Sequence, residues 1–134
     1  MEKSRASRID GVPNILPSII ISQRIQEKAS LAGFDWEGID EVWEKLNEEI
    51  SELKIAQKEK DISKIHEEIG DLLFTVINLS RFFDISAENA LRQSNKKFVK
   101  RFRLLEKRVD ALKKKIDDFS PKQLDEIWRE VKKK

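Results

Sequence analysis

The chain has 134 residues, 39% of them charged and 39% hydrophobic, with four glycines, three prolines and no cysteine. This length suits one domain with its own core, and the composition favours a helical protein over a disordered one. The 27 basic and 25 acidic residues leave a net charge of +2, which indicates no nucleic-acid or membrane partner, while the missing cysteines exclude disulfides and thiolate chemistry.

Five helices are predicted, because apolar residues recur every three or four positions in five segments. An irregular arm over residues 1–14 precedes them, and residues 15–134 are expected to form a single all-α domain. The helices are expected over about residues 17–32, 39–58, 62–83, 86–116 and 121–132. The polar start and the absence of a long apolar run predict neither a signal peptide nor a membrane span, so a cytoplasmic location is expected.

Large aromatic residues occupy two places where their role is open. Phe34 and Trp36 follow Gly33, the expected stop of the first helix, in a short loop. Their rings either cap the core or stack against a nucleobase, since aromatic faces bind bases without sequence-specific hydrogen bonds. Trp128 in the last helix has the same two interpretations.

The second predicted helix carries an acidic cluster, Glu48, Glu49 and Glu52. At about 100° per residue, Glu49 falls inside the apolar stripe of this helix and Glu48 falls outside it. A carboxylate at a core-facing position costs several kcal/mol unless it is paired or bound to a cation. The alternative to a cation is that Glu49 meets a lysine or arginine of a neighbouring helix.

The third predicted helix carries a second acidic pair, Glu68 and Asp71, three residues apart and therefore on one face. Residues 72–80 contain no charge, so this part of the helix is expected to be buried on every side. If the two helices pack side by side, four carboxylates converge: Glu49, Glu52, Glu68 and Asp71. Hard divalent cations such as Mg²⁺ prefer such oxygen ligands and share their remaining sites with water and phosphates.

The fourth predicted helix, with Ser86 as its N-cap, has an apolar stripe of about seven turns. One compact monomer of this size does not cover so long a stripe, so a homo-oligomer is expected. Lys97 and Arg101 lie one turn apart beside Asn95. The two basic residues form either a solvated face or a contact to phosphates held by the acidic residues.

Two kinds of site are absent from the sequence. His66 is the only histidine, so one chain assembles no histidine metal cluster and no triad. No glycine-rich phosphate loop is present either, because Gly33 and Gly70 are isolated. Phosphate binding is therefore expected to depend on metals and basic side chains.

Several strings together resemble the MazG nucleoside triphosphate pyrophosphohydrolases of the all-α NTP pyrophosphatase superfamily. The acidic motifs EExxE and ExxD are the first of these, and the flanking strings extend the similarity over about residues 10–132. Longer members of the family carry two tandem copies of such a unit, and this sequence carries one. The matching residues are Gly11-Val12-Pro13, Gly33-Phe34-Asp35-Trp36, Glu48-Glu49 with Glu52, Glu68 to Phe74, Asn78-Leu79, Ala90-Leu91-Arg92, Asn95 to Phe102 and Trp128.

The resemblance implies a four-helix core completed by homodimerisation, as a dimer or a dimer of dimers. It implies hydrolysis of a nucleoside triphosphate to the monophosphate and pyrophosphate with Mg²⁺, for which Mn²⁺ is a possible substitute. By position match, the metal ligands are Glu49, Glu52, Glu68 and Asp71, and the substrate-binding residues are Asn95, Lys97, Arg101, Phe34, Trp36 and Trp128. We expect Mg²⁺-activated water, oriented by Glu48 or Glu49 as catalytic residues, to attack the α-phosphorus.

Two other classes of function are compatible with a helical chain. A helical interaction module would use the acidic residues only to solvate its surface and would bind no Mg²⁺. A nucleic-acid binder would use the basic C-terminal third. The sequence argues against that class because acidic residues interrupt the basic stretch, at Asp110, Asp117, Asp118, Asp125, Glu126 and Glu130.

Overall fold

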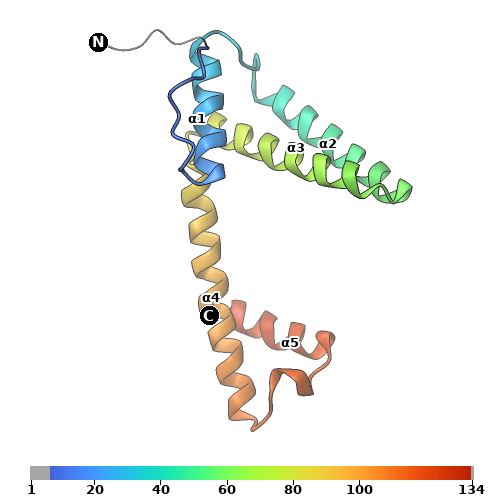
Figure 1. The fold of residues 1–134 in the computed structure, drawn as a ribbon. Coiled ribbons are helices and arrows are strands. Elements are labelled where there is room, and N and C mark those ends of the chain that lie inside the picture. The colour runs from blue at the N-terminus through green and yellow to red at the C-terminus, as the bar shows by residue number, and fades with distance from the viewer. Residues whose placement is uncertain (1–6, 134) are drawn as a thin grey trace. The chain divides into compact units, whose positions relative to one another are not determined.

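The computed structural model describes residues 7–133, and all regular structure among them is helical (Figure 1), so the all-α prediction is confirmed. The predicted arm lies partly outside the described residues; positions 7–17 form turns and irregular structure. The elements are α1 (Ser18–Leu31), α2 (Ile39–Glu59), α3 (Ile62–Phe82), α4 (Ala87–Ala111), the short 3₁₀ helix η1 (Ile116–Asp118) and α5 (Pro121–Lys132).

The chain divides into two compact units, Met1–Asn89 and Ala90–Lys134. The first unit contains α1, α2 and α3, and the second contains most of α4 together with α5. Each unit is described by itself below. A single domain over 15–134, and a four-helix core completed by homodimerisation, remain predictions.

In the first unit, α2 and α3 form a helical hairpin and lie side by side (Figure 1), and α1 also packs against α3. The turn between α2 and α3 is short because Lys60 takes a left-handed backbone conformation, with φ of 55°. Asp61 then caps α3 by accepting a hydrogen bond from the backbone N–H of Lys64 at 3.2 Å. This tight hairpin sets acidic positions of α2 opposite those of α3.

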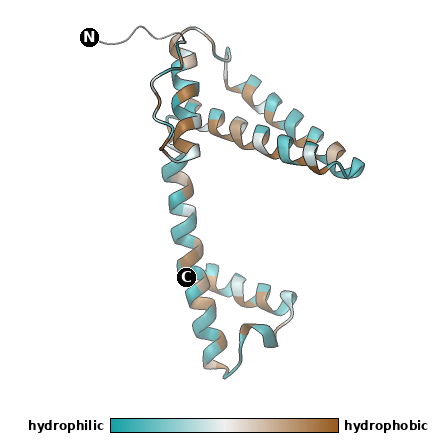
Figure 2. Cartoon of the chain, in the orientation of Figure 1, coloured by the Kyte–Doolittle hydropathy of each residue, from teal (hydrophilic) through white to brown (hydrophobic). Residues whose placement is uncertain are grey.

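Within the single chain, the central part of α3 is not covered on every side, so the expected burial of residues 72–80 is met only in part. Leu73 is 60% exposed, Phe74 40% and Val76 42%, whereas Ile77 is buried. The reason is that α2 and α1 cover only part of the circumference of α3. Hydrophobic and hydrophilic positions interleave along α2 and α3 (Figure 2).

The second unit has its own small apolar core between α4 and α5. Leu105, Val109 and Val131 are buried at its centre. The partly buried residues packed around them are Leu104, Ile116, Phe119, Leu124, Ile127 and Trp128. Pro121 occupies the first turn of α5, and Ser120 with Gln123 forms a capping box there.

The fourth helix is shorter than the predicted 86–116, because α4 ends at Ala111. Lys113 turns into the left-handed region with φ of 56°. The Lys113 N–H then bonds to the Asp110 carbonyl and the Lys114 N–H to the Val109 carbonyl, which is a Schellman stop. Ile116 therefore reaches the core from η1 rather than from α4. Among the described residues, no helix combines the length and apolar character needed to cross a membrane.

Candidate functional site

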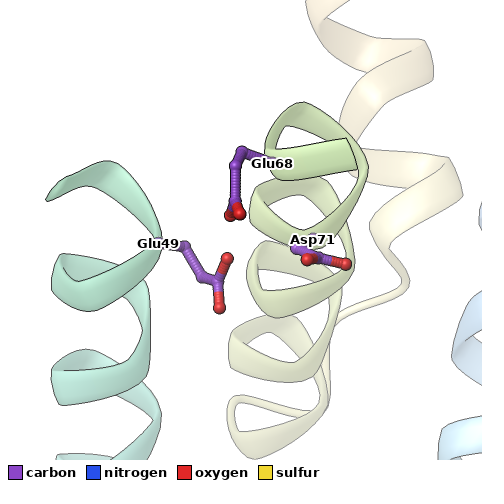
Figure 3. A group of neighbouring side chains, drawn as sticks. All are labelled: Glu49, Glu68 and Asp71. Atoms are coloured by element: carbon purple, nitrogen blue, oxygen red, sulfur yellow. The ribbon is translucent and has the colours of Figure 1, made fainter. Parts of the chain in front are cut away.

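Three of the predicted metal ligands come together between α2 and α3. Glu49 extends from α2, and Glu68 and Asp71 belong to the facing part of α3 (Figure 3). One carboxylate oxygen from each of the three lies within 4.8 Å of the other two. Glu49 is 2% exposed and Glu68 7% exposed, while Asp71 is exposed at the edge of the group.

Heptad spacing on the two helices explains why these acidic residues point inward. Val42, Glu49 and Ala56 are buried at seven-residue intervals on α2, and Glu68 and Thr75 are buried at the same interval on α3. Side chains spaced by seven lie on one side of a helix, close to two full turns apart. The carboxylates of Glu49 and Glu68 therefore occupy positions at which apolar side chains normally fill the seam between paired helices.

One oxygen of Glu49 has a cationic partner on its own helix. Lys45 Nζ lies 2.9 Å from Glu49 Oε1 and 3.6 Å from Glu48 Oε1. The hydrogen bond to Glu49 raises the pKa of Lys45. The sequence alternative was therefore half right: Glu49 does meet a lysine, but the lysine lies one turn earlier on α2 and not on a neighbouring helix.

One oxygen of each buried glutamate has no hydrogen-bond partner among the described residues. Glu49 Oε2 and Glu68 Oε2 are both buried without a hydrogen bond within residues 7–133. Burial, together with the carboxylates of Glu49 and Glu52, raises the pKa of Glu68 to about 7. A single lysine thus compensates a group of several carboxylates. The excess negative charge favours the binding of either a proton or a cation by this group.

Glu52 and Glu48 lie around this trio in different ways. Glu52 is half-buried next to Glu68, and both line a pocket of about 340 Å³ that opens between α2 and α3. Glu48 is exposed, outside the apolar stripe, as the helical-wheel angles predict. Metal ligation by Glu52 and a catalytic role for Glu48 stay predictions.

Asn95, Lys97 and Arg101 belong to α4 in the second unit. Asn95 and Lys97 are exposed, and Arg101 is partly buried. Their contact with phosphates held by the acidic trio stays a prediction. Trp128 packs against the Phe98 ring with centroids 5.3 Å apart, in agreement with its structural interpretation, and substrate contact by Trp128 also stays a prediction.

Phe34 and Trp36 line a pocket of about 440 Å³ in the first unit. The loop that carries them is fixed by Asp35, whose carboxylate accepts hydrogen bonds from Ser30 Oγ at 2.7 Å and from Arg81 Nη2 at 2.7 Å. The bond from Arg81 is the main reason that the pKa of Asp35 falls to about 2. The pocket therefore has a fixed wall rather than a free loop.

Three residues at these sites were missed from the sequence: Lys45, Gln26 and Arg81. A signal existed for Lys45, which precedes Glu49 by four residues and so lies on the same face of α2. No signal existed for the other two. Gln26 contacts α3 across 48 residues and Arg81 contacts Asp35 across 46, and periodicity within one helix gives no information on such partners.

Residues 38–103 match the family model of the MazG nucleotide pyrophosphohydrolase domain. This range contains α2, α3 and the first two thirds of α4. All four predicted metal ligands lie in it, together with Asn95, Lys97 and Arg101.

Curated relatives from Thermotoga maritima and Escherichia coli match over nearly the whole chain, and one from Bacillus subtilis matches about half of it. The nucleoside triphosphate pyrophosphohydrolase/pyrophosphatase MazG of Thermotoga maritima is 41% identical over 130 residues, which is 97% of this chain and 50% of that protein. The nucleoside triphosphate pyrophosphohydrolase of Escherichia coli strain K12 is 36% identical over 133 residues, or 98% and 51%. The uncharacterised YabN of Bacillus subtilis strain 168 is 37% identical over 65 residues, or 48% and 13%.

The chain spans about half the length of the first two of these relatives. The shared part includes the acidic trio between α2 and α3, which lies inside the matched domain. Through this domain, the chain belongs to the MazG family.

Proposed function

We propose that the chain hydrolyses nucleoside triphosphates to the nucleoside monophosphate and pyrophosphate, using Mg²⁺ or, as a substitute, Mn²⁺. The observation that carries this proposal is the oxygen-rich trio of Glu49, Glu68 and Asp71, in which two buried carboxylate oxygens have no hydrogen-bond partner among the residues that the structure describes. The names of the two long relatives, both nucleoside triphosphate pyrophosphohydrolases, support the same activity.

The residues of the trio fit a hard divalent cation. All donors are carboxylate oxygens, and neither sulfur nor imidazole is among them. Leaving a buried carboxylate oxygen unpaired is costly, and a cation would remove that cost for Glu49 and Glu68 together. A divalent cation bound here would polarise phosphate oxygens and lower the pKa of water in its coordination sphere.

In this proposal, Glu49, Glu68 and Asp71 hold the cation, and Glu52 joins them from the next turn of α2. Lys45 fixes the Glu49 carboxylate through its 2.9 Å contact, so that the second oxygen stays directed to the seam between the helices. Glu48 or Glu49 orients the attacking water and accepts its proton.

The reaction transfers the α-phosphoryl group to water. The oxygen of water forms a bond to the α-phosphorus, and the bond from that phosphorus to the α–β bridging oxygen breaks, which releases pyrophosphate. Lys97 and Arg101, with Asn95 beside them, stabilise the negative charge that grows on the phosphate oxygens. Phe34, Trp36 and Trp128 are the candidates for contact with the nucleoside.

A panel of nucleoside triphosphates with Mg²⁺ tests the reaction. We expect monophosphate and pyrophosphate as products, and in ¹⁸O-labelled water we expect the label in the monophosphate, because attack is at the α-phosphorus. Label in the pyrophosphate would place the attack at the β-phosphorus. Diphosphate and orthophosphate as products would contradict the proposal altogether.

Glu49→Gln tests the trio. Turnover should fall at least about 100-fold, because even outer-shell partners of metal ligands are worth about 10–100-fold. Glu44→Gln is the matched control, since Glu44 is exposed on the same helix, and its activity should equal that of the parent. Circular dichroism checks that both variants fold. Full activity of Glu49→Gln would exclude the ligand assignment.

A further inference from the structure

Lys45 holds one of the two oxygens of a carboxylate that belongs to the acidic trio. Its Nζ lies 2.9 Å from Glu49 Oε1, a distance typical of a charge-assisted hydrogen bond. The Glu49 side chain is only 3% exposed, so water competes little for that oxygen. Glu49 Oε2 has no hydrogen-bond partner in the described part of the chain. The carboxylate therefore offers one oxygen, and not two, to a bound cation.

Stabilisation of α2 does not account for this contact. Lys45 precedes Glu49 by four residues, and a lysine before a glutamate stabilises a helix less than the reverse order does. The exposed pair of Asp125 and Arg129 on α5 has the more favourable order, with the acid first. The Lys45 contact instead brings a positive charge to a buried carboxylate in the seam between α2 and α3.

The contact also distinguishes Glu49 from the other two members of the trio. Glu49 extends from α2 toward Glu68 and Asp71 (Figure 3). Within residues 7–133, no lysine or arginine forms an ion pair with Glu68 or Asp71. The three carboxylates together carry six oxygens, and Lys45 occupies one of them. The trio is therefore short of one oxygen ligand, and the missing oxygen is that of Glu49.

Mg²⁺ and Ca²⁺ differ in the number of protein oxygens that they require. Mg²⁺ takes an octahedral set of ligands at about 2.0–2.1 Å and usually keeps several waters, so one oxygen from each carboxylate is enough. Ca²⁺ takes about 6–8 oxygens at about 2.3–2.6 Å, and carboxylates that bind through both oxygens help to supply them. The loss of one carboxylate oxygen therefore weakens the binding of Ca²⁺ more than that of Mg²⁺.

We infer that Lys45 is a positioning residue that favours Mg²⁺ over Ca²⁺, because it restricts Glu49 to ligation through one oxygen. The inference rests on the proposed function, which places a divalent cation at the trio. Lys45 acts through Glu49 and does not contact the cation. Its ammonium group also repels both cations, but this repulsion is the same for equal charges. The ratio of the two affinities therefore reports the ligation of Glu49.

Lys45→Met tests this inference, because methionine is a good helix former and removes the ammonium group. The Mg²⁺ and Ca²⁺ affinities of the metal-free chain, without nucleotide, are measured by displacement of Mn²⁺, followed by the EPR signal of free Mn²⁺. The dissociation constant of Ca²⁺ divided by that of Mg²⁺ should fall about tenfold relative to the parent, since partners of metal ligands change affinity by about 10–100-fold. An unchanged ratio would overturn the inference.

Lys64→Met is the matched control for the removal of charge. Lys64 lines the pocket between α2 and α3 that also contains Glu52 and Glu68, but it forms no ion pair with Glu49. The Asp61 cap uses the backbone N–H of Lys64, so the change leaves the cap intact. Both cations should bind more tightly by the same factor, and the ratio should equal that of the parent. Equal falls of the ratio in both lysine variants would assign the effect to charge alone and overturn the inference.

Infrared difference spectra on addition of Ca²⁺ report the ligation directly. The antisymmetric and symmetric carboxylate stretching bands lie closer together for ligation through two oxygens than through one. We expect Lys45→Met to gain a closely spaced pair of bands, and this pair should be lost in Lys45→Met/Glu49→Gln. A pair that persists in the double variant would overturn the inference. A closely spaced pair in the parent that disappears in Glu49→Gln would also overturn it, even if Lys45→Met does not fold.

The same titrations separate this inference from the proposed function. A parent that binds none of Mn²⁺, Mg²⁺ and Ca²⁺ at millimolar concentration would exclude the trio as a cation site, and the selection by Lys45 would fall with it. Binding of all three cations, with one and the same ratio for Ca²⁺ and Mg²⁺ in the parent and in Lys45→Met, would leave the proposed function and exclude the role of Lys45.

Discussion

Glu49 and Glu68 are placed where a helical hairpin normally packs apolar side chains, and their charges are only partly compensated. Lys45 Nζ contacts one oxygen of Glu49, whereas no lysine or arginine within residues 7–133 forms an ion pair with Glu68. Two like charges in a shared site repel, so one of them gains a proton more easily. Burial is the main reason that the pKa of Glu68 rises, and the neighbouring carboxylates of Glu49 and Glu52 raise it further.

The stability of the metal-free chain should therefore fall as the pH rises. The pKa of Glu68 rises from 4.5 to about 7 on folding, so the folded state holds the proton more tightly than the unfolded state between these values. The proton on Glu68 stabilises the folded state fully below pH 4.5, and this stabilisation is lost as the pH rises through 7. Urea midpoints in EDTA should decrease over this window in the parent, but not in Glu68→Gln.

Glu67→Gln serves as the control for this titration, because Glu67 precedes Glu68 on an exposed position. It should keep the pH dependence of the parent. A parent midpoint that is constant, or rises, between pH 4.5 and pH 7 in EDTA would show that Glu68 is ionised in the folded chain throughout.

At the scale of single residues, the sequence predicts whether a side chain points toward the core better than it predicts which residue that side chain contacts. The inward direction of Glu49 follows from its place in the apolar stripe of α2, and the structure confirms it. The partner of a polar side chain depends on how helices far apart in the sequence meet. The contacts of Gln26 with Phe74 and of Arg81 with Asp35 could not be predicted for this reason.

Four of the helices end in the same backbone conformation, although the residue types at three of these ends give no sign of it. A left-handed residue follows the end of each of α1, α2, α3 and α4 by one or two positions: Gly33, Lys60, Asp84 and Lys113. In each case the next N–H reaches back to a carbonyl five residues earlier, as in a Schellman motif. Glycine is the usual signal for such a stop, so only the end of α1 could be predicted from it.

Because Lys113 is not a glycine, the sequence gives no sign that α4 ends just before it. The apolar stripe of α4 continues through Leu112 to Ile116, so periodicity alone extends the helix beyond Ala111. The start of a helix is easier to predict, because its caps are side chains. Ser86 Oγ accepts from the Asn89 N–H at 3.2 Å, and Asp61 caps α3 in the same way.

Replacing a left-handed lysine by glycine should stabilise the hairpin of α2 and α3. A non-glycine residue in this conformation costs about 1–2 kcal/mol, which exceeds the entropic cost of glycine, about 0.5–1 kcal/mol. Lys60→Gly should therefore raise the free energy of unfolding by about 0.5–1 kcal/mol in urea titrations. Lys58→Gly, inside α2, should lower it by about 1 kcal/mol. Equal effects of both changes would contradict this account.

On the scale of the whole molecule, apolar side chains remain uncovered in each unit. Leu73 and Val76 are exposed on α3, and Phe98, Val99 and Leu91 are exposed on α4. Contiguous exposed apolar surface of this kind marks interaction sites in water-soluble folds. The length of the apolar stripe on the fourth helix predicts such a surface from the sequence, although nothing in the sequence states what covers it.

We propose that a second copy of the chain covers the exposed face of α3, as expected for a homodimer or a dimer of dimers. Leu73→Lys would place a charge in that interface, where an unpaired buried charge costs about 3–5 kcal/mol. The dissociation constant in sedimentation equilibrium should rise by at least about 100-fold, which corresponds to about 2.7 kcal/mol. Leu31→Lys, at an exposed position near the end of α1, should leave it unchanged. A parent that sediments as a monomer at millimolar concentration would contradict the prediction, because solvent would then be the only partner of this face.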